Sequence, residues 1–349
     1  MGRVLVTGGS GFLAGWCLAA LDAAGWETVA TVRAPDREAG LRERLAAAGV
    51  RDPAATGVRV ADLTRDEGWA EAVAGCDFVL HVASPFGGSE PDSEAELIAA
   101  ARDGTLRVLR AAAAGKVRRV VLTSSFAAVG YGHPEREAPF TEADWTRVDQ
   151  PDVAPYIRSK AVAERAAWDF MAGAGGMELS VINPVGIFGP VLGQDFASSI
   201  DIIRRMLEGA MPAAPRTYFG LVDVRDVADL HLRAMVHPSA AGERFLAVAG
   251  EPLSMLEVAA ILREGLGPAG ARAPAAELPD AVVHDLARTS PEMARLAAQL
   301  GRRRRASAAK AREVLGWRSR PNAGIVLDTA RSLFAHGGIA PGDGKAEAP

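Results

Sequence analysis

The segment Thr7-Gly-Gly-Ser-Gly-Phe-Leu-Ala14 stands between a short apolar run, Arg3-Val-Leu-Val6, and an Ala- and Leu-rich stretch. Gly8 permits a tight turn, Gly11 allows a phosphate to approach the backbone, and the small Ala14 lets a helix pack closely on a strand. A helix that begins here points its free N–H groups and the positive end of its dipole at the loop. The chain is therefore predicted to open with a strand, a loop and a helix that bind a dinucleotide.

The following residues alternate between short apolar runs and longer Ala-rich stretches. Strands covered on both faces by helices are continuous runs of apolar and β-branched residues. Such runs occur at Val4 to Thr7, Thr28 to Arg33, Val58 to Ala61, Phe78 to Ala83, Val120 to Ser125 and Leu179 to Asn183. Helices are expected between them, at Phe12 to Ala24, Arg37 to Ala48, Trp69 to Ala74, Glu94 to Ala114 and Pro155 to Ala174. This order predicts an α/β fold with a Rossmann-type doubly wound parallel sheet.

After Pro184 the alternation stops. One strand is expected at Arg244 to Val248, and helices are expected at Met255 to Leu266, Ser290 to Leu300, Ser307 to Leu315 and Ile325 to His336. We therefore expect a nucleotide-binding domain over residues 1–184, with the sheet rejoined near 222–250, and a smaller, mostly helical substrate-binding lobe over 185–338. Residues 340–349 are rich in Gly, Pro and charge, and are expected to form a disordered tail.

Composition and charge exclude several classes of binding partner. A formal net charge of −4 argues against a nucleic-acid or anionic membrane surface. The basic run Arg302 to Arg305 is interpreted as the solvated edge of a helix. The chain enters a strand at once and has no run of 18 apolar residues, so we expect no membrane partner and a cytoplasmic location. Cys17 and Cys76 are expected to be buried free thiols, and no metal is expected.

Tyr156 and Lys160 form a pair at helical i,i+4 spacing in a chain with 3 tyrosines, where Arg fills nearly every other basic position. A tyrosine hydroxyl can donate a proton to a carbonyl oxygen, and an ammonium group beside it lowers the phenol pKa. Lysine can also bind a ribose hydroxyl through its three donors. Ser125 ends the fifth predicted strand at the carboxyl edge of the sheet, and it is a candidate second donor to the substrate oxygen.

The end of the second predicted strand bears on the choice between the two nicotinamide dinucleotides. An Asp or Glu there would bind the adenosine ribose and repel a 2′-phosphate, whereas this chain has Arg33 and, four residues later, Arg37. Guanidinium groups suit a phosphate, so NADP(H) is the expected cofactor. The next two strands are expected to line its groove, with Asp62 and Leu63 near the adenine and with Val82, Ala83 and Ser84 farther along.

Several motifs together resemble one enzyme family. They are Thr7-Gly-x-x-Gly-Phe12, Thr123-Ser-Ser125, Tyr156-x-x-Ser-Lys160, Asn183-Pro184 with Gly189-Pro190, and Lys310-Ala-Arg-Glu-Val-Leu-Gly-Trp317. Over residues 3–338 the chain is similar to the extended short-chain dehydrogenase/reductases. Within them it resembles the dihydroflavonol-reductase-like branch, which includes bacterial NADPH-dependent aldehyde and ketone reductases. The segments Ala30-Thr-Val-Arg33 and Phe140-Thr-Glu-Ala-Asp-Trp145 support that branch.

The resemblance implies roles for single residues. Tyr156 would be the general acid, Lys160 would tune its pKa and bind the ribose, and Ser125 would donate to the carbonyl oxygen. Pro184 and Val185 match positions that contact the nicotinamide, and Ser199 matches a contact to a cofactor phosphate. The other positions implied at the cofactor are Thr7, Gly8, Ser10, Gly11, Phe12, Leu13 and Thr123.

The substrate pocket departs from that of the plant flavonoid reductases. Those enzymes hold the polyphenol with an Asn and a Gln at positions where this chain has Gly130 and Gly220, which argues against a flavonoid substrate. The expected lining is aromatic and aliphatic, with no clamp for an anionic group, and comprises Phe86, Phe126, Val129, Tyr131, Phe196, Tyr218 and Leu221. Such a pocket suits a small, uncharged and hydrophobic ketone or aldehyde.

Two other functions share these motifs. A nucleotide-sugar epimerase or dehydratase would retain bound NAD, against which Arg33 counts. A non-catalytic NADP(H)-sensing protein would keep the fold but lose the acid, against which Ser125, Tyr156 and Lys160 count. The expected function is NADPH-dependent reduction of a carbonyl compound, in a monomer or homodimer.

Overall fold

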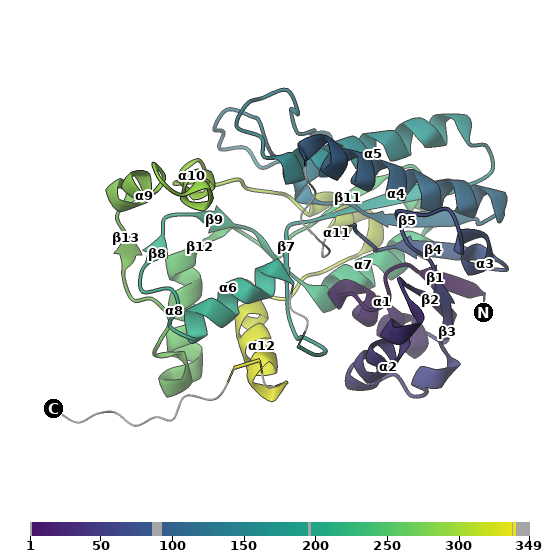
Figure 1. The fold of residues 1–349 in the computed structure, drawn as a ribbon, viewed down its shortest axis with the longest axis horizontal. Coiled ribbons are helices and arrows are strands. Elements are labelled where there is room, and N and C mark those ends of the chain that lie inside the picture. Colours follow the sequence, from purple (N-terminus) through teal and green to yellow (C-terminus); the bar gives the residue numbers. More distant parts are fainter. Residues whose placement is uncertain (1, 86–92, 195–196, 337, 340–349) are drawn as a thin grey trace.

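The computed structural model describes residues 2–85, 93–194, 197–336 and 338–339. Its centre is a sheet of seven parallel strands in the order β11-β6-β5-β4-β1-β2-β3 (Figure 1). The strands are β1 (Arg3–Val6), β2 (Glu27–Val32), β3 (Gly57–Val60), β4 (Phe78–His81), β5 (Arg119–Thr123), β6 (Glu178–Pro184) and β11 (Arg244–Ala247). The order runs outward in both directions from the β1–β4 pair, which confirms the predicted doubly wound α/β fold.

Helices cover both faces of this sheet, because strand side chains alternate between the faces. Val4 and Val6 of β1 belong to one core cluster, and Leu5 between them belongs to the other. The first face is covered by α1 (Phe12–Ala23), α2 (Glu38–Ala47), α7 (Val224–Val236) and α11 (Ala309–Leu315), and the second by α3 (Trp69–Val73), α4 (Glu94–Ala114) and α5 (Pro155–Gly173). Figure 1 shows these two layers on opposite sides of the strands.

A second group of elements lies beside the sheet and forms a smaller lobe with its own core. The lobe has five helices in the described residues: α6 (Ser198–Leu207), α8 (Met255–Leu266), α9 (Asp280–Leu286), α10 (Pro291–Ala297) and α12 (Asn322–Ala335). Its strands are short and pair two by two: β7 (Gly186–Phe188) with β10 (Leu221–Asp223), β9 (Tyr218–Phe219) with β12 (Leu253–Ser254), and β8 (Ala214–Pro215) with β13 (Glu277–Leu278). The apolar faces of α6, α8 and α12 bury one cluster between them.

Short 3-10 helices occupy several connections: η1 (Pro35–Arg37), η2 (Pro53–Ala55), η3 (Phe126–Ala128), η4 (Pro238–Ala240) and η5 (Gly267–Gly270). η3 follows β5 directly, so the chain turns sharply at the edge of the sheet where ligands bind in open α/β folds. None of the helices in the described ranges combines the length and apolar composition that a membrane span requires.

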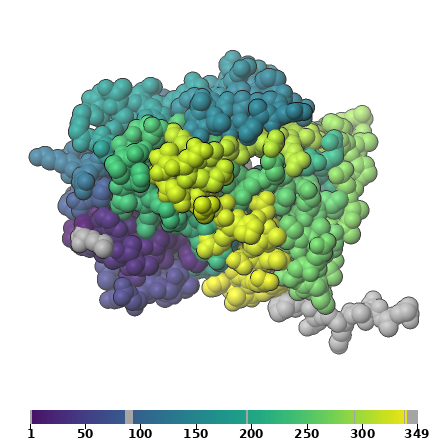
Figure 2. Space-filling view, turned by 180° about the vertical axis from the view of Figure 1, so that it is seen from behind, coloured from purple at the N-terminus to yellow at the C-terminus, as the bar shows by residue number. Residues whose placement is uncertain are grey.

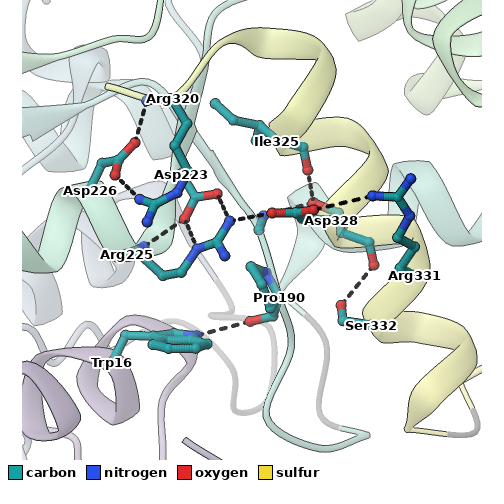
Figure 3. Close-up of polar contacts among 12 residues, drawn as sticks. Trp16, Pro190, Asp223, Arg225, Asp226, Arg320, Ile325, Asp328, Arg331 and Ser332 are labelled. Carbon is teal, nitrogen blue, oxygen red and sulfur yellow. Dashed lines mark hydrogen bonds and ion pairs between the residues drawn. The ribbon is translucent and has the colours of Figure 1, made fainter. Parts of the chain in front are cut away.

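Polar contacts tie the two lobes together. Figure 3 shows Arg225 of α7 between two carboxylates, with Nη2 donating to Asp223 at 2.7 Å and to Asp328 of α12 at 2.6 Å. The indole N–H of Trp16 on α1 donates to the carbonyl oxygen of Pro190 at 2.9 Å. Seen from behind, α12 lies in yellow between the green smaller lobe and the purple start of the chain (Figure 2). These contacts fix the segment after β6, which forms one wall of the cleft described next.

Candidate active site

A single cleft of about 1170 Å³ runs along the carboxyl edge of the sheet, from the glycine-rich loop to the first residues of the smaller lobe. Parallel strands all end at this edge, so residues distant in the sequence meet there. The cleft is lined by most of the predicted cofactor residues, namely Gly8, Ser10, Gly11, Phe12, Leu13, Arg33, Arg37, Leu63, Val82, Ala83, Ser84, Thr123, Pro184, Val185 and Ser199. The three predicted catalytic residues, Ser125, Tyr156 and Lys160, line it as well.

The glycine-rich loop is shaped by positions where a side chain would not fit. Gly8 has φ of +70°, and a Cβ there would lie 3.0 Å from the backbone of Ala83. Its N–H donates to Thr31 Oγ1 at 2.9 Å, and the N–H of Gly11 donates to the Gly8 carbonyl at 2.8 Å. Gly11 is the N-cap of α1 and gives that helix no side-chain cap. The first N–H groups of α1 are therefore left for a ligand, which fits a pyrophosphate.

Three arginines line the end of the cleft near β2. Arg33 and Arg37 were predicted there, and Arg44 of α2 joins them. Arg37 and Arg44 are seven residues apart, which is two helical turns, so this spacing was a signal that the sequence contained. No carboxylate takes the place of Arg33 at the end of β2. The arrangement fits a dinucleotide with an additional phosphate on its adenosine ribose.

At the other end of the cleft, Ser125 and Tyr156 come together. Ser125 is the N-cap of η3, and its Oγ accepts the Ala127 N–H at 3.1 Å, which leaves the hydroxyl proton to be donated. Tyr156 stands in the first turn of α5, which Pro155 starts. Burial of its hydroxyl end, with a contribution from Tyr131, raises the pKa of Tyr156, and a hydrogen bond with Ser125 acts in the opposite direction. The hydroxyl is therefore protonated at neutral pH, as a proton donor must be.

Lys160 lies one turn farther along α5, with its ammonium group 5.8 Å from the centre of the Tyr156 ring. Its Nζ donates to Ser84 Oγ at 3.1 Å, across the cleft from α5. Burial lowers the pKa of Lys160 to about 8, so the group still carries its charge at neutral pH. Tyr156 is 47% exposed as a residue and lines the cleft.

A partly buried polar contact lies behind Thr123 of the cleft lining, and sequence reasoning missed it. His231 of α7 has Nδ1 2.8 Å from the Val227 carbonyl and Nε2 2.7 Å from Thr123 Oγ1. Because a carbonyl oxygen can only accept, Nδ1 carries the proton and the Thr123 hydroxyl donates to Nε2. Burial lowers the pKa of His231 to about 4, which keeps this tautomer neutral.

Four predicted residues with described positions do not line the cleft. Thr7 is fully buried, and its Oγ1 accepts the N–H groups of Val82 and Ala83. It therefore positions the residues that follow β4. The Asp62 carboxylate accepts both the N–H and the hydroxyl of Thr64 at 2.8 Å. Val129 and Leu221 are fully buried in separate core clusters.

Some of the predicted substrate residues line the cleft and others do not. Phe126, Tyr131 and Tyr218 line the same cleft as the predicted catalytic residues. Phe86 and Phe196 lie outside the described residues. Among the residues that the structure does describe, no three His, Cys, Asp or Glu side chains are grouped to hold a metal ion.

The basic run Arg302 to Arg305 is not on a helix, so its interpretation as a helix edge was wrong. These residues form an irregular segment between α10 and α11, and Arg304 lines the cleft. Arg304 therefore brings a cationic group to a cleft whose expected substrate lining had no clamp for an anionic group. No local pattern predicts this placement, because a run of four arginines does not show which one faces inward.

Comparisons with known proteins agree with the fold. The family model described as the NAD dependent epimerase/dehydratase family matches residues 4–248. Cinnamoyl-CoA reductase CAD2 of Medicago truncatula is 36% identical over 269 residues, which are 75% of this chain and 80% of that protein. The ketoreductase azaE of Aspergillus niger is 36% identical over 299 residues, which are 80% of this chain and 86% of that protein.

A solved structure is similar over nearly the whole chain. Yeast methylglyoxal/isovaleraldehyde reductase Gre2, complexed with NADPH, has a TM-score of 0.78 at 25% identity, and the match covers 96% of this chain and 99% of that chain. The family model covers more than half of the chain, and the curated relatives are reductases of the predicted branch. The chain therefore belongs to the NAD dependent epimerase/dehydratase family, the extended short-chain dehydrogenase/reductases.

Proposed function

We propose that the protein reduces an aldehyde or ketone with a hydrophobic body, with NADPH as the reductant. The observation that carries this proposal is the meeting of Ser125, Tyr156 and Lys160 at one end of a cleft whose other end has the glycine-rich loop and three arginines. The relatives named as reductases, and the similar structure named as an NADPH complex, support both the reaction and the cofactor.

In this proposal each residue has a separate task. The loop and the α1 N-terminus bind the pyrophosphate, Arg33 and Arg37 bind the 2′-phosphate, and the bound nicotinamide supplies the hydride. Ser125 and Tyr156 donate hydrogen bonds to the substrate oxygen, and Tyr156 transfers its proton to that oxygen as the alcohol forms. The charge of Lys160 favours the phenolate that remains.

A panel of carbonyl compounds tests the proposal. Aryl ketones, β-keto esters and aliphatic aldehydes are offered to the purified protein with NADPH or NADH, and cofactor oxidation is followed by absorbance. We expect oxidation of NADPH with at least one class and formation of the corresponding alcohol. NADPH binding without turnover of any class would favour a sensor, and copurified NAD with turnover of a nucleotide sugar would favour an epimerase.

Replacement of Arg33 by alanine tests the cofactor assignment. We expect the KM for NADPH to rise about 10- to 100-fold, because a charge-assisted bond to the 2′-phosphate is lost. The KM for NADH should change far less, since NADH has no such phosphate. Arg51→Ala removes an exposed arginine of the same domain that does not line the cleft, and it serves as the control. Equal effects of Arg33→Ala on both cofactors would contradict the assignment.

A further inference from the structure

Arg304 differs from Arg302 and Arg305 of the same basic run. Arg302 donates to Asp152 at 2.8 Å, and Arg305 forms two hydrogen bonds with Glu251, at 2.8 and 2.7 Å. Both of these ion pairs are more than one third exposed. Arg304, by contrast, turns into the cleft and is among the residues that line it.

Arg304 forms no ion pair within the described residues, and the nearby Asp152 is already paired with Arg302. Its guanidinium group lies 4.4 Å from the centre of the Tyr131 ring, and Nη1 donates to Gln299 Oε1 at 2.9 Å. No carboxylate of the described residues lies within 4.0 Å of it, although 20 other ion pairs of this kind, most of them formed by arginines, are present there. Burial lowers the pKa of Arg304, which indicates that water solvates this cation incompletely.

A partly desolvated guanidinium group without a counter-ion is costly to hold in a folded protein. Its planar set of donors fits the two oxygens of a carboxylate or a phosphate, and here the amide of Gln299 occupies one side of that set. Arg304 also lines the open volume of the cleft. An anion that enters the cleft would therefore meet a positioned and incompletely solvated partner.

Arg304 stands at the substrate end of the cleft. Tyr131, over which it lies, makes an edge contact with Phe126, and Phe126 directly follows Ser125. Tyr131 is also close enough to Tyr156 to raise the pKa of that residue. The pyrophosphate loop and Arg33 are at the opposite end, so the charge of Arg304 is not needed for a cofactor phosphate.

We propose that Arg304 binds an oxyanion group of the substrate, so the natural substrate is a carbonyl compound that carries a carboxylate or a phosphate away from its reacting carbon. This inference rests on the proposed reduction and narrows its substrate class. It replaces the expectation of an uncharged substrate, while the aromatic residues Phe126, Tyr131 and Tyr218 still contact the body of the molecule.

Matched substrates test this inference. The carboxylates 3- and 4-formylbenzoate are compared with their methyl esters, and 4-formylphenyl phosphate tests the phosphate alternative. We expect wild-type protein to prefer at least one of the anions, and Arg304→Met to lower kcat/KM for it by about 10- to 100-fold. The kcat/KM of the Arg304→Met protein for the methyl esters should fall much less. Arg304→Lys should restore part of the activity on the anion, because it keeps the charge but not the planar fork.

Arg305→Met is the control, because it removes a neighbouring positive charge that lies outside the cleft lining and is paired with Glu251. It should leave the preference for the anion unchanged. Equal losses on acid and ester in Arg304→Met would indicate a structural role and overturn the inference, as would an unchanged preference.

Failure of the proposed reduction would be visible separately, as no turnover of esters or anions by the wild-type protein. In that case, calorimetry measures the binding of 4-(hydroxymethyl)benzoate and of its methyl ester to the protein with NADP⁺, and so tests the oxyanion site without turnover. Tighter binding of the acid that disappears in Arg304→Met supports an oxyanion site. Equal binding of acid and ester to the wild-type protein overturns it.

Discussion

Replacement of Tyr156 by phenylalanine is expected to lower kcat by about 100-fold or more, because a positioned general acid is lost while the ring remains. The hydroxyl is the group that can both hydrogen-bond the substrate oxygen and give it a proton. Its raised pKa keeps the proton in place until the carbonyl oxygen gains negative charge. The measurement is steady-state oxidation of NADPH with the best carbonyl compound of the panel.

Tyr218→Phe is the matched control for this variant. Tyr218 also lines the cleft, on β9 of the smaller lobe, but the cation over its ring is an arginine, Arg303, at 5.7 Å, and not a lysine on the same helix. Its loss should change KM more than kcat. The Tyr156→Phe protein should bind NADPH as tightly as wild type in a fluorescence titration, and undiminished turnover by it would remove Tyr156 from the role of acid.

Most of the central fold was predictable because its signals are local. Apolar runs of strand length alternate with Ala-rich stretches, and Gly25, Gly49 and Gly75 each adopt a positive φ just after a helix. The expected helix from Glu94 to Ala114 has these same ends in the structure. The two- and three-residue strands of the smaller lobe were not predicted, because so short a strand has no periodicity to detect.

The cofactor half of the site followed from the fold. Once strands are parallel, the residues after each strand must meet at one edge, so Gly8, Arg33 and Ser84 could be grouped from the sequence alone. The substrate half of the site could not be predicted in this way. Apolar residues such as Val129 and Leu221 look alike whether they line a cleft or fill a core, and only tertiary packing separates the two cases.

Arg304 shows the same limit for a charged residue. Its segment reaches the cleft because Phe140 and Ala306 form a β-bridge, with the Phe140 N–H donating to the Arg305 carbonyl at 2.8 Å. Phe140 and Arg305 are more than 160 positions apart in the sequence. No local pattern relates them, so the position of the arginine depends on how the two lobes pack.

Replacement of Glu164 by alanine is expected to lower the free energy of unfolding by about 3–5 kcal/mol, as for other broken buried ion pairs. The Glu164 side chain on α5 is fully buried, and Oε1 accepts Arg244 Nε at 2.6 Å. Its Oε2 accepts Asn183 Nδ2 at 2.6 Å and the Ser124 hydroxyl. The Trp168 indole N–H also donates to Oε1, at 3.4 Å, so the loss would remove the acceptor of a buried guanidinium group and of three other donors. Chemical denaturation measures the change.

The exposed ion pair of Asp229 with Arg233 on α7 is the control. Both side chains are more than 40% exposed, so Asp229→Ala should cost less than about 1 kcal/mol. A similar small loss for Glu164→Ala would contradict the importance of the buried pair.

The double variant Glu164→Leu with Arg244→Met separates the ion pair from the hydrogen bonds. Buried ion pairs can often be replaced by apolar side chains of similar volume at little cost, so the double variant should recover much of the stability lost in Glu164→Ala. It would still lack the acceptor for Asn183, whose Nδ2 also donates to the Ser125 carbonyl at 3.2 Å. Stability should therefore recover further than kcat, because the carboxylate that holds Asn183 against Ser125 is still absent. Equal recovery of both would show that Glu164 serves the fold alone.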